Sequence, residues 1–249
     1  MIGASGRLEQ DGSCYLILTT PRTGSYLLCD LLRQSGVAGR PDEYFAPEHQ
    51  ARVTGGLAVS TRTYLEELRQ ASWERFGGVF AAKVMWRQLQ SYLLPALRDR
   101  SEPSNQSGLT AAFPNLKVIH LRRRDTARQA LSYARAIQTG TWVQTTATAA
   151  DCQGPTPQDM ELTRQLERAI KADNRAIDGF LKHCDVPVLD LAYEDLAHDP
   201  SRTLQTCLTF LGLGPAVPPG LKPRLIKQSA PVRDAWFEAY RTFTQGEPA

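Results

Sequence analysis

The sequence predicts an α/β fold in which helices flank a central parallel sheet. Short apolar runs alternate with helical patterns along the 249 residues, and this alternation favours parallel strands joined by right-handed crossovers. A chain of this length suits one α/β domain, so we expect a single domain over residues 1–249, with a flexible N-terminus at residues 1–12. The expected core strands are residues 14–19, 78–85, 117–121 and 186–192.

Helices are expected between and after these strands. A leucine-rich helical pattern follows the first strand and stops at Gly36, since glycine favours the position just past a helix end. Residues 101–110 are rich in Ser, Pro, Asn and Gly, which predicts a loop, and residues 145–157 predict a mobile segment. The other expected helices are residues 88–97, 125–139, 158–184, 200–211 and 232–243.

Composition and charge argue against several classes of protein. The formal net charge is +3, from 29 basic and 26 acidic residues, which is too small an excess to predict nucleic-acid binding. No run approaches the ~18 apolar residues of a transmembrane segment, and the N-terminus lacks the apolar stretch of a secretory signal. The five cysteines form no CxxC pair, and the four histidines form no HxxxH or HExxH pattern. We therefore expect a cytoplasmic protein with reduced cysteines and no metal site.

A turn of small and polar residues follows the first expected strand and reads TTPRTGSY at residues 19–26. Small residues let backbone N–H groups approach an anion, and the N-terminus of the next helix adds unpaired donors and a positive dipole. Arg22 adds a forked charge that suits phosphate or sulfate, while Thr23 and Ser25 add hydroxyl donors. The residues of the expected anion site are Pro21, Arg22, Thr23, Gly24, Ser25 and Tyr26.

This turn differs from the phosphate loop of nucleoside triphosphatases. That loop reads GxxxxGK[ST], and its lysine reaches the terminal phosphates. Here the turn has no GK pair, and Arg22 precedes Gly24. Hydrolysis of a nucleoside triphosphate is therefore disfavoured, and a turn that binds no ligand is the alternative.

Further motifs follow the turn along the chain. They are DEYF at residues 42–45, AKVMW at 82–86, HLRRRDTARQALSYARAIQTGTW at 120–142, YEDLAHDP at 193–200, Lys227-Gln228, and RDAW at 233–236. With TTPRTGSYLL at residues 19–28, their order resembles that of sulfotransferases, close to the bacterial trehalose 2-sulfotransferase family and its nodulation-factor sulfotransferase relatives. The resemblance spans about residues 14–240.

The resemblance implies a P-loop-NTPase-like three-layer fold with a central parallel sheet flanked by helices. It also implies 3′-phosphoadenosine-5′-phosphosulfate as the donor, no metal, and a homodimer. Adenosine 3′,5′-bisphosphate would be the second product. Trehalose is suggested only by the nearest family, so a carbohydrate or glycolipid-like hydroxyl is the expected acceptor. The acceptor-binding segments match least well, at residues 48–72 and 145–157.

Two other functions stay open at this point. One is an ATP-dependent small-molecule kinase that uses the same turn, and the missing GK[ST] argues against it. The other is a non-catalytic nucleotide-binding module, against which a catalytic carboxylate would argue.

Glu43 is the candidate catalytic base. Residues 37–39 can return to the sheet as a short parallel strand, which would bring Glu43 to the carboxyl edge, where such sheets bind ligands. An attacking hydroxyl needs a positioned base, and a carboxylate can serve. In the resembled family the matching Glu has that role. The alternative is a surface carboxylate in a loop.

Arg123 and Ser132 are the candidates for binding the donor's 3′-phosphate. Arg123 directly follows the third expected strand, and Ser132 lies on the next helix with Arg128 on the same face. The common sulfotransferase spacing of eight residues fits Arg124, whereas the spacing of nine in the closest relatives fits Arg123. Arg122 also stays open, and a solvated basic cluster is the alternative.

Two lysines complete the expected site. Lys83 interrupts an apolar strand, and a buried charge needs a partner. It could stabilise the leaving phosphate together with Arg22, hold the acceptor, or extend to solvent from an edge strand. Lys227 is expected at the 3′-phosphate, because the resembled C-terminal segment has a basic residue followed by Gln, which favours it over Arg224.

The segment at residues 193–195 and several aromatic residues receive no catalytic role. The segment Tyr193-Glu194-Asp195 is expected to be mainly structural, with Asp195 capping a short helix. Five aromatic residues could pack on a sugar or adenine, or could fill the core. They are Trp86, Tyr92, Tyr133, Trp142 and Trp236.

Overall fold

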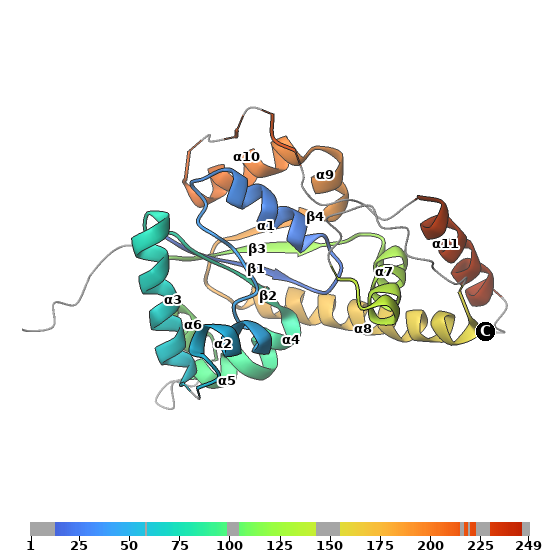
Figure 1. The fold of residues 1–249 in the computed structure, drawn as a ribbon, viewed down its shortest axis with the longest axis horizontal. Coiled ribbons are helices and arrows are strands. Elements are labelled where there is room, and N and C mark those ends of the chain that lie inside the picture. The colour runs from blue at the N-terminus through green and yellow to red at the C-terminus, as the bar shows by residue number, and fades with distance from the viewer. Residues whose placement is uncertain are drawn as a thin grey trace, which may run out of the picture.

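The computed structural model describes residues 13–57, 59–98, 105–142, 155–214, 217–218, 220–222 and 230–245. Within these residues, the strands of one parallel sheet lie in the order β2-β1-β3-β4. They are β1 (Cys14–Thr19), β2 (Phe80–Met85), β3 (Leu116–Arg122) and β4 (Val188–Ala192). Because every pairing is parallel, the carboxyl ends of all the strands lie at one edge of the sheet (Figure 1).

Helices connect these strands and flank the sheet. They are α1 (Ser25–Gln34), α2 (Pro47–Thr54), α3 (Thr61–Phe76), α4 (Trp86–Gln88), the π-helical η1 (Leu89–Leu93), α5 (Leu94–Leu97), α6 (Asn105–Ala112), α7 (Thr126–Thr139), α8 (Pro157–Lys182), α9 (Tyr193–His198), α10 (Pro200–Leu211) and α11 (Ala230–Gln245). None of the helices within the described residues is long and apolar enough to cross a membrane.

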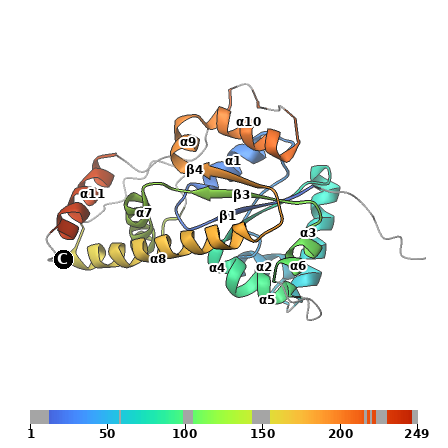
Figure 2. The same cartoon turned by 180° about the vertical axis from the view of Figure 1, so that it is seen from behind.

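Alternating side chains of β1 build a separate apolar core on each face of the sheet. Tyr15 and Ile17 pack with buried residues of α1 and α10 on one face. Leu16 and Leu18 pack with residues of α3, α5 and α8 on the other. Figures 1 and 2 show the resulting layers, with α1 and α10 across the sheet from α8. The predicted α/β class with a central parallel sheet is confirmed.

Most of the predicted elements are confirmed, with small differences in their ends. The first strand has the predicted bounds, while β2 and β4 each begin two residues later than expected. The expected helices at residues 125–139, 158–184, 200–211 and 232–243 correspond to α7, α8, α10 and α11. Residues 48–72, which the sequence left unassigned, contribute to α2 and α3.

The predicted strand at residues 37–39 is wrong. The chain returns to the sheet later, at Asp42, which forms an isolated parallel bridge with Ala82 and whose carbonyl accepts the Lys83 N–H at 2.8 Å. Gly36 and Gly39 have φ angles of +74° and +67°. These left-handed conformations turn the chain instead of extending it.

Two further predictions are wrong in part. The expected loop at residues 101–110 contains the start of α6, because Leu109 is buried in the core and this burial outweighs the polar composition of the segment. The expected helix at residues 88–97 is interrupted by the π-helical η1. Residues 1–12 and 145–154 lie outside the described residues, so their expected flexibility stays a prediction. The end of the expected mobile segment instead provides the N-cap of α8, Thr156, and its first residue, Pro157.

Gly39 should tolerate a side chain less well than Gly36. A Cβ on Gly39 would lie 2.6 Å from the carbonyl oxygen of Val79, whereas a Cβ on Gly36 would meet open space. Alanine in the left-handed region costs roughly 1–2 kcal/mol at either position, and only Gly39→Ala adds a clash. We expect Gly39→Ala to lower the free energy of unfolding by about 2 kcal/mol more than Gly36→Ala in urea denaturation. Equal losses would mean that Val79 moves aside.

Candidate active site

A cavity of about 1300 Å³ lies at the carboxyl edge of the sheet. The turn after β1, the loop before α2, and helices α7, α8 and α11 all contribute to its wall. It brings together most of the residues selected from the sequence, although they come from distant segments. Those that line it are Pro21, Arg22, Gly24, Ser25, Tyr26, Glu43, Arg123 and Ser132.

The turn between β1 and α1 has a backbone that an anion could approach closely. Arg22 and Gly24 both have left-handed conformations, with φ angles of +65° and +82°. A Cβ on Gly24 would lie 2.5 Å from the ring of Tyr193, so the position favours glycine for two separate reasons. Helix α1 begins at Ser25, and its first N–H groups lack intrahelical acceptors. These donors and the positive end of the helix dipole therefore suit phosphate or sulfate.

Thr23 turns its hydroxyl away from the cavity. The residue is fully buried, and its hydroxyl contacts that of Thr19 and donates to the carbonyl of Thr20 at 3.2 Å. Gln129 of α7 supports the same turn by donating to the Thr20 hydroxyl at 2.9 Å and to the Pro21 carbonyl at 2.6 Å. The expected hydroxyl donation from Thr23 to a ligand is therefore not supported. These contacts hold the turn in place.

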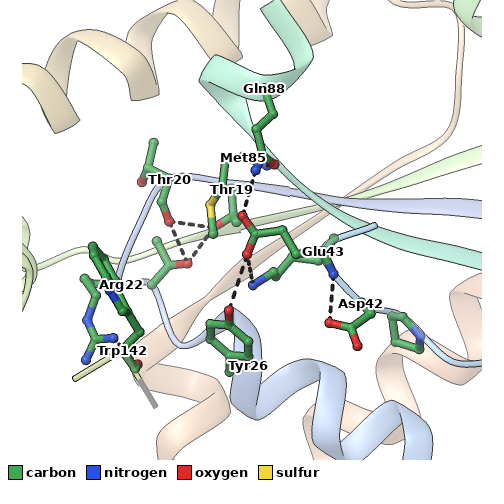
Figure 3. Close-up of polar contacts among 12 residues, drawn as sticks. Thr19, Thr20, Arg22, Tyr26, Asp42, Glu43, Met85, Gln88 and Trp142 are labelled. Atoms are coloured by element: carbon green, nitrogen blue, oxygen red, sulfur yellow. Dashed lines mark hydrogen bonds and ion pairs between the residues drawn. The ribbon is translucent and has the colours of Figure 1, made fainter. Parts of the chain in front are cut away.

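Arg22 connects the turn to the far wall of the cavity. Its Nε donates to the Ser132 hydroxyl at 3.1 Å, and its guanidinium also hydrogen-bonds the carbonyl of Trp142, as Figure 3 shows for the pair with Trp142. Burial, and after it the positive charge of Arg123, lowers the pKa of Arg22. Two guanidinium groups thus share one region, which favours a ligand with more than one negative charge.

Two of the three consecutive arginines pair with acidic side chains. Arg122 forms ion pairs with Asp190 at 2.8 Å and with Asp178 at 3.5 Å. Arg124 forms two hydrogen bonds with Asp195, at 3.0 and 2.6 Å. Neither arginine is among the residues that line the cavity. Asp195 was expected to cap a short helix. This expectation is wrong, because the N-cap of α9 is Ala192 and Asp195 lies within the helix.

Arg123 faces the cavity and stacks on an aromatic ring. Its guanidinium carbon lies 4.6 Å from the centroid of the Tyr193 ring, an arrangement that stabilises a cation. Its Nε is buried, and the described residues provide no hydrogen-bond partner for it. Burial lowers the pKa of Arg123. A buried N–H without an acceptor costs about 1–3 kcal/mol, and a bound anion would remove this cost.

Tyr193 is a cavity residue that the sequence analysis treated as structural. Its ring lies close to both the Gly24 position and the Arg123 guanidinium. Its place directly after β4, at the ligand-binding edge of the sheet, is the signal that could have identified it. Of the aromatic residues left unassigned, Trp86, Tyr133, Trp142 and Trp236 also line the cavity.

Glu43 lies at the centre of a polar network (Figure 3). Its Oε2 lies 2.6 Å from the Lys83 ammonium and accepts a hydrogen bond from the Tyr26 hydroxyl at 3.4 Å. Its Oε1 accepts from the Gln88 amide at 2.8 Å. The side chain is 19% exposed and lines the cavity. The alternative of a surface carboxylate is therefore wrong.

Lys83 lies behind Glu43. Its side chain has no exposed surface, and its ammonium lies 3.4 Å from the centroid of the Tyr26 ring. The alternative of an edge-strand lysine that extends to solvent is therefore wrong, since the buried charge is paired with Glu43. Glu43 and Tyr26 line the cavity and Lys83 does not. The expected direct contact of Lys83 with a leaving phosphate or an acceptor thus finds no support.

A second group of polar residues lines the cavity beyond Glu43. The Arg87 guanidinium pairs with Asp173 at 3.0 Å, which joins α4 to α8. His49 of α2 shares a hydrogen bond of 3.1 Å with the Tyr64 hydroxyl, and partial burial lowers its pKa. No motif in the sequence marks these residues, because their positions on α2, α4 and α8 carry none. The group consists of Glu48, His49, Arg52, Arg87 and Asp173.

Two further expectations concern Lys227 and a metal site, and the structure describes only part of the chain that bears on them. Lys227 lies outside the described residues, so its place at the 3′-phosphate stays a prediction. Among the residues that the structure describes, no three His, Cys, Asp or Glu side chains come together as a group that could hold a metal ion.

Comparisons with known proteins identify the family to which the chain is similar. The model of the Stf0 sulphotransferase family matches residues 14–242. A trehalose 2-sulfotransferase of Mycolicibacterium smegmatis is 27% identical over 94% of this chain and 96% of its own length. A trehalose 2-sulfotransferase of Mycobacterium tuberculosis is 26% identical over 91% of this chain and 94% of its own length.

A solved structure has a similar fold. The sulfotransferase domain from the curacin biosynthetic pathway superimposes with a TM-score of 0.51 at 17% identity, covering 90% of this chain and 83% of that domain. This likeness concerns the fold, and it confirms the predicted P-loop-NTPase-like arrangement. Because the family model spans the sheet, both helical layers and the cavity, the chain belongs to the Stf0 sulphotransferase family and is a sulfotransferase.

Proposed function

We propose that the protein transfers a sulfuryl group from 3′-phosphoadenosine-5′-phosphosulfate to a hydroxyl of a carbohydrate or glycolipid-like acceptor. One observation carries this proposal: a carboxylate held by a buried lysine lines the same cavity as two arginines and the turn before α1. A base and an anion site are the two parts that sulfuryl transfer to a hydroxyl requires. Family membership favours this reaction over the kinase and the non-catalytic module.

The residues of the cavity suit the two charged ends of this donor. We assign the 5′-phosphosulfate to the turn over residues 21–26, through Arg22, the Ser25 hydroxyl and backbone N–H groups that include that of Thr23. We assign the 3′-phosphate to Arg123 and Ser132, with Lys227 as a further ligand. The buried Nε of Arg123 supports this assignment, because it lacks an acceptor among the described residues.

The reaction that we propose is a direct, in-line transfer. Glu43 removes the proton of the acceptor hydroxyl, and the electron pair of that oxygen forms the new bond to sulfur. The bond between sulfur and the bridging oxygen breaks, and its electron pair leaves with adenosine 3′,5′-bisphosphate. Arg22 and the N–H groups of the turn stabilise the charge on the bridging oxygen. Lys83 acts through Glu43, by balancing the charge of the carboxylate at 2.6 Å.

The acceptor side of the cavity suits a polyhydroxylated molecule. Charged groups of both signs lie near Trp86, so hydroxyl groups would find donors, acceptors and an aromatic face. The names of the two mycobacterial relatives support a carbohydrate acceptor. The first test is an assay with donor labelled in its sulfate and a panel of acceptors that includes trehalose. Transfer from ATP, without transfer from the labelled donor, would overturn the proposal.

We also propose a homodimer in the cytoplasm. The dimer rests on the resemblance to the family, and the location rests on the composition of the chain. Light scattering of the purified protein should give about twice the chain mass of 27.6 kDa, and a mass equal to one chain would contradict the dimer.

Replacing Glu43 by glutamine should lower turnover strongly. We expect a loss of about 100-fold or more in kcat, because a general base contributes roughly 10²–10⁴-fold, with little change in affinity for adenosine 3′,5′-bisphosphate. Glu66 is an exposed carboxylate of α3, and Glu66→Gln serves as the matched control. Wild-type turnover of Glu43→Gln would remove Glu43 from the base role.

A structural effect of this substitution can be separated from a catalytic one. Glu43→Gln leaves the buried Lys83 ammonium without its carboxylate, which costs about 3–5 kcal/mol of stability. The double variant Glu43→Gln/Lys83→Met removes both charges and should recover thermal stability without recovering turnover. Turnover that returned together with stability would assign the pair to folding alone.

Replacing Arg123 by alanine should weaken donor binding. We expect the Kd for adenosine 3′,5′-bisphosphate to rise roughly 10- to 100-fold in calorimetry, which corresponds to the loss of a hydrogen bond to a charged group. Arg124→Ala is the control, because Arg124 already pairs with Asp195 at the surface. Unchanged affinity in Arg123→Ala would remove Arg123 from the 3′-phosphate site.

A further inference from the structure

Gln88 holds the carboxylate that we propose as the base. Its Nε2 donates to Oε1 of Glu43 at 2.8 Å (Figure 3), yet Gln88 is not among the residues that line the cavity. We infer that Gln88 is a positioning residue that orients Glu43 so that Oε1 receives the proton of the acceptor hydroxyl, an inference that rests on the proposed function.

Glu43 needs such support because it lies outside the helices and strands. Its backbone is held, since its N–H donates to the Asp42 carboxylate at 2.9 Å and its carbonyl accepts from the Ala46 N–H at 3.1 Å. A glutamate side chain nevertheless has several rotatable bonds and loses conformational entropy when it is fixed. Neighbouring side chains must therefore supply its orientation.

The partners of Glu43 leave one acceptor position on the carboxylate. A carboxylate has about four lone-pair sites. Lys83 and Tyr26 both contact Oε2, and Gln88 is the one partner that the described residues provide for Oε1. The remaining site is thus on Oε1, and the proton of the acceptor passes to this atom as the new bond to sulfur forms.

The amide of Gln88 has one favourable orientation. Its Oε1 accepts from the backbone N–H of Met85 at 3.0 Å, while its Nε2 faces Glu43. A reversed amide would place N–H against N–H at Met85 and oxygen against oxygen at Glu43, and both contacts are repulsive. The backbone at the end of β2 therefore determines which atom Gln88 presents to the carboxylate.

A π-helical turn begins directly after Gln88 and gives independent support. Such turns are rare and occur frequently at functional sites. The hydroxyl of Tyr92, within η1, accepts hydrogen bonds from Gln50 at 2.7 Å and Thr61 at 2.9 Å. These bonds tie η1 to α2 and α3, so the segment that carries Gln88 has a fixed place opposite Glu43.

The first test replaces Gln88 by methionine, which keeps the length of the side chain and removes both hydrogen bonds. We expect kcat to fall roughly 10- to 100-fold, as for a lost hydrogen bond to a charged group, while KM for the donor stays within about twofold because the donor site is untouched. The assay measures the adenosine 3′,5′-bisphosphate that forms with trehalose present and, separately, in buffer without an acceptor. Gln90 is exposed on the same helical segment, and Gln90→Met should keep wild-type turnover.

A double variant shows whether Gln88 acts through Glu43. Adding Gln88→Met to Glu43→Gln should cause no further loss of turnover, since the carboxylate to be positioned is absent. A further loss, or wild-type kcat in Gln88→Met alone, would overturn the inference. Wild-type turnover in Glu43→Gln would instead overturn the proposed base.

A structural measurement keeps the inference testable apart from activity. If Gln88→Met fails to fold, Gln88→Asn retains a polar group and withdraws it by one methylene. Crystals of the variant that folds should show Oε1 of Glu43 displaced from its place in the wild-type protein. An unmoved carboxylate would contradict the positioning role.

Discussion

A buried ammonium group determines the arrangement of the end of the cavity where we propose the base. Lys83 has no exposed surface and comes from an otherwise apolar strand, and an unpaired charge in such a place costs several kcal/mol. Glu43 offsets this cost from a loop, and the Tyr26 ring adds its face from α1. One charge therefore holds together β2, the loop before α2 and the first helix. The carboxylate at the cavity wall is positioned by the same contact.

The other end of the cavity is arranged around positive charge. Arg22 adopts a left-handed conformation in the turn after β1, and Arg123 follows β3 with its guanidinium on the Tyr193 ring. The same ring packs against the Gly24 position, so one aromatic side chain contacts both the turn and the arginine. The two ends meet at Tyr26, which belongs to the turn that we propose as the anion site and also hydrogen-bonds Glu43. The proposed base and the proposed anion site thus lie within one wall, which is the geometry that transfer of a charged group requires.

Much of the fold could be predicted from local patterns. The apolar run of β1 and the leucine repeat of α1 have the expected positions, because burial on a sheet and on a helix imposes periods that the sequence shows directly. The errors occur where distant contacts decide. Leu109 is not part of a local apolar pattern, yet it is buried in the core, and helix α6 forms around it. The chain returns to the sheet at Asp42 because of a bridge to Ala82, which no local pattern encodes.

By itself, the sequence determined the class of fold, the turn after the first strand and the set of residues from which a sulfotransferase site could be built. These features depend on short-range periodicity and on the order of motifs along the chain. Only the tertiary structure decided which residues face the cavity. Arg123 points into the cavity while its two neighbours pair with acids, Thr23 turns inward, and Gln88 meets Glu43 from another segment. The physical reason is that the partner of a charged or polar side chain is set by packing between distant elements, and spacing along the chain does not specify that packing.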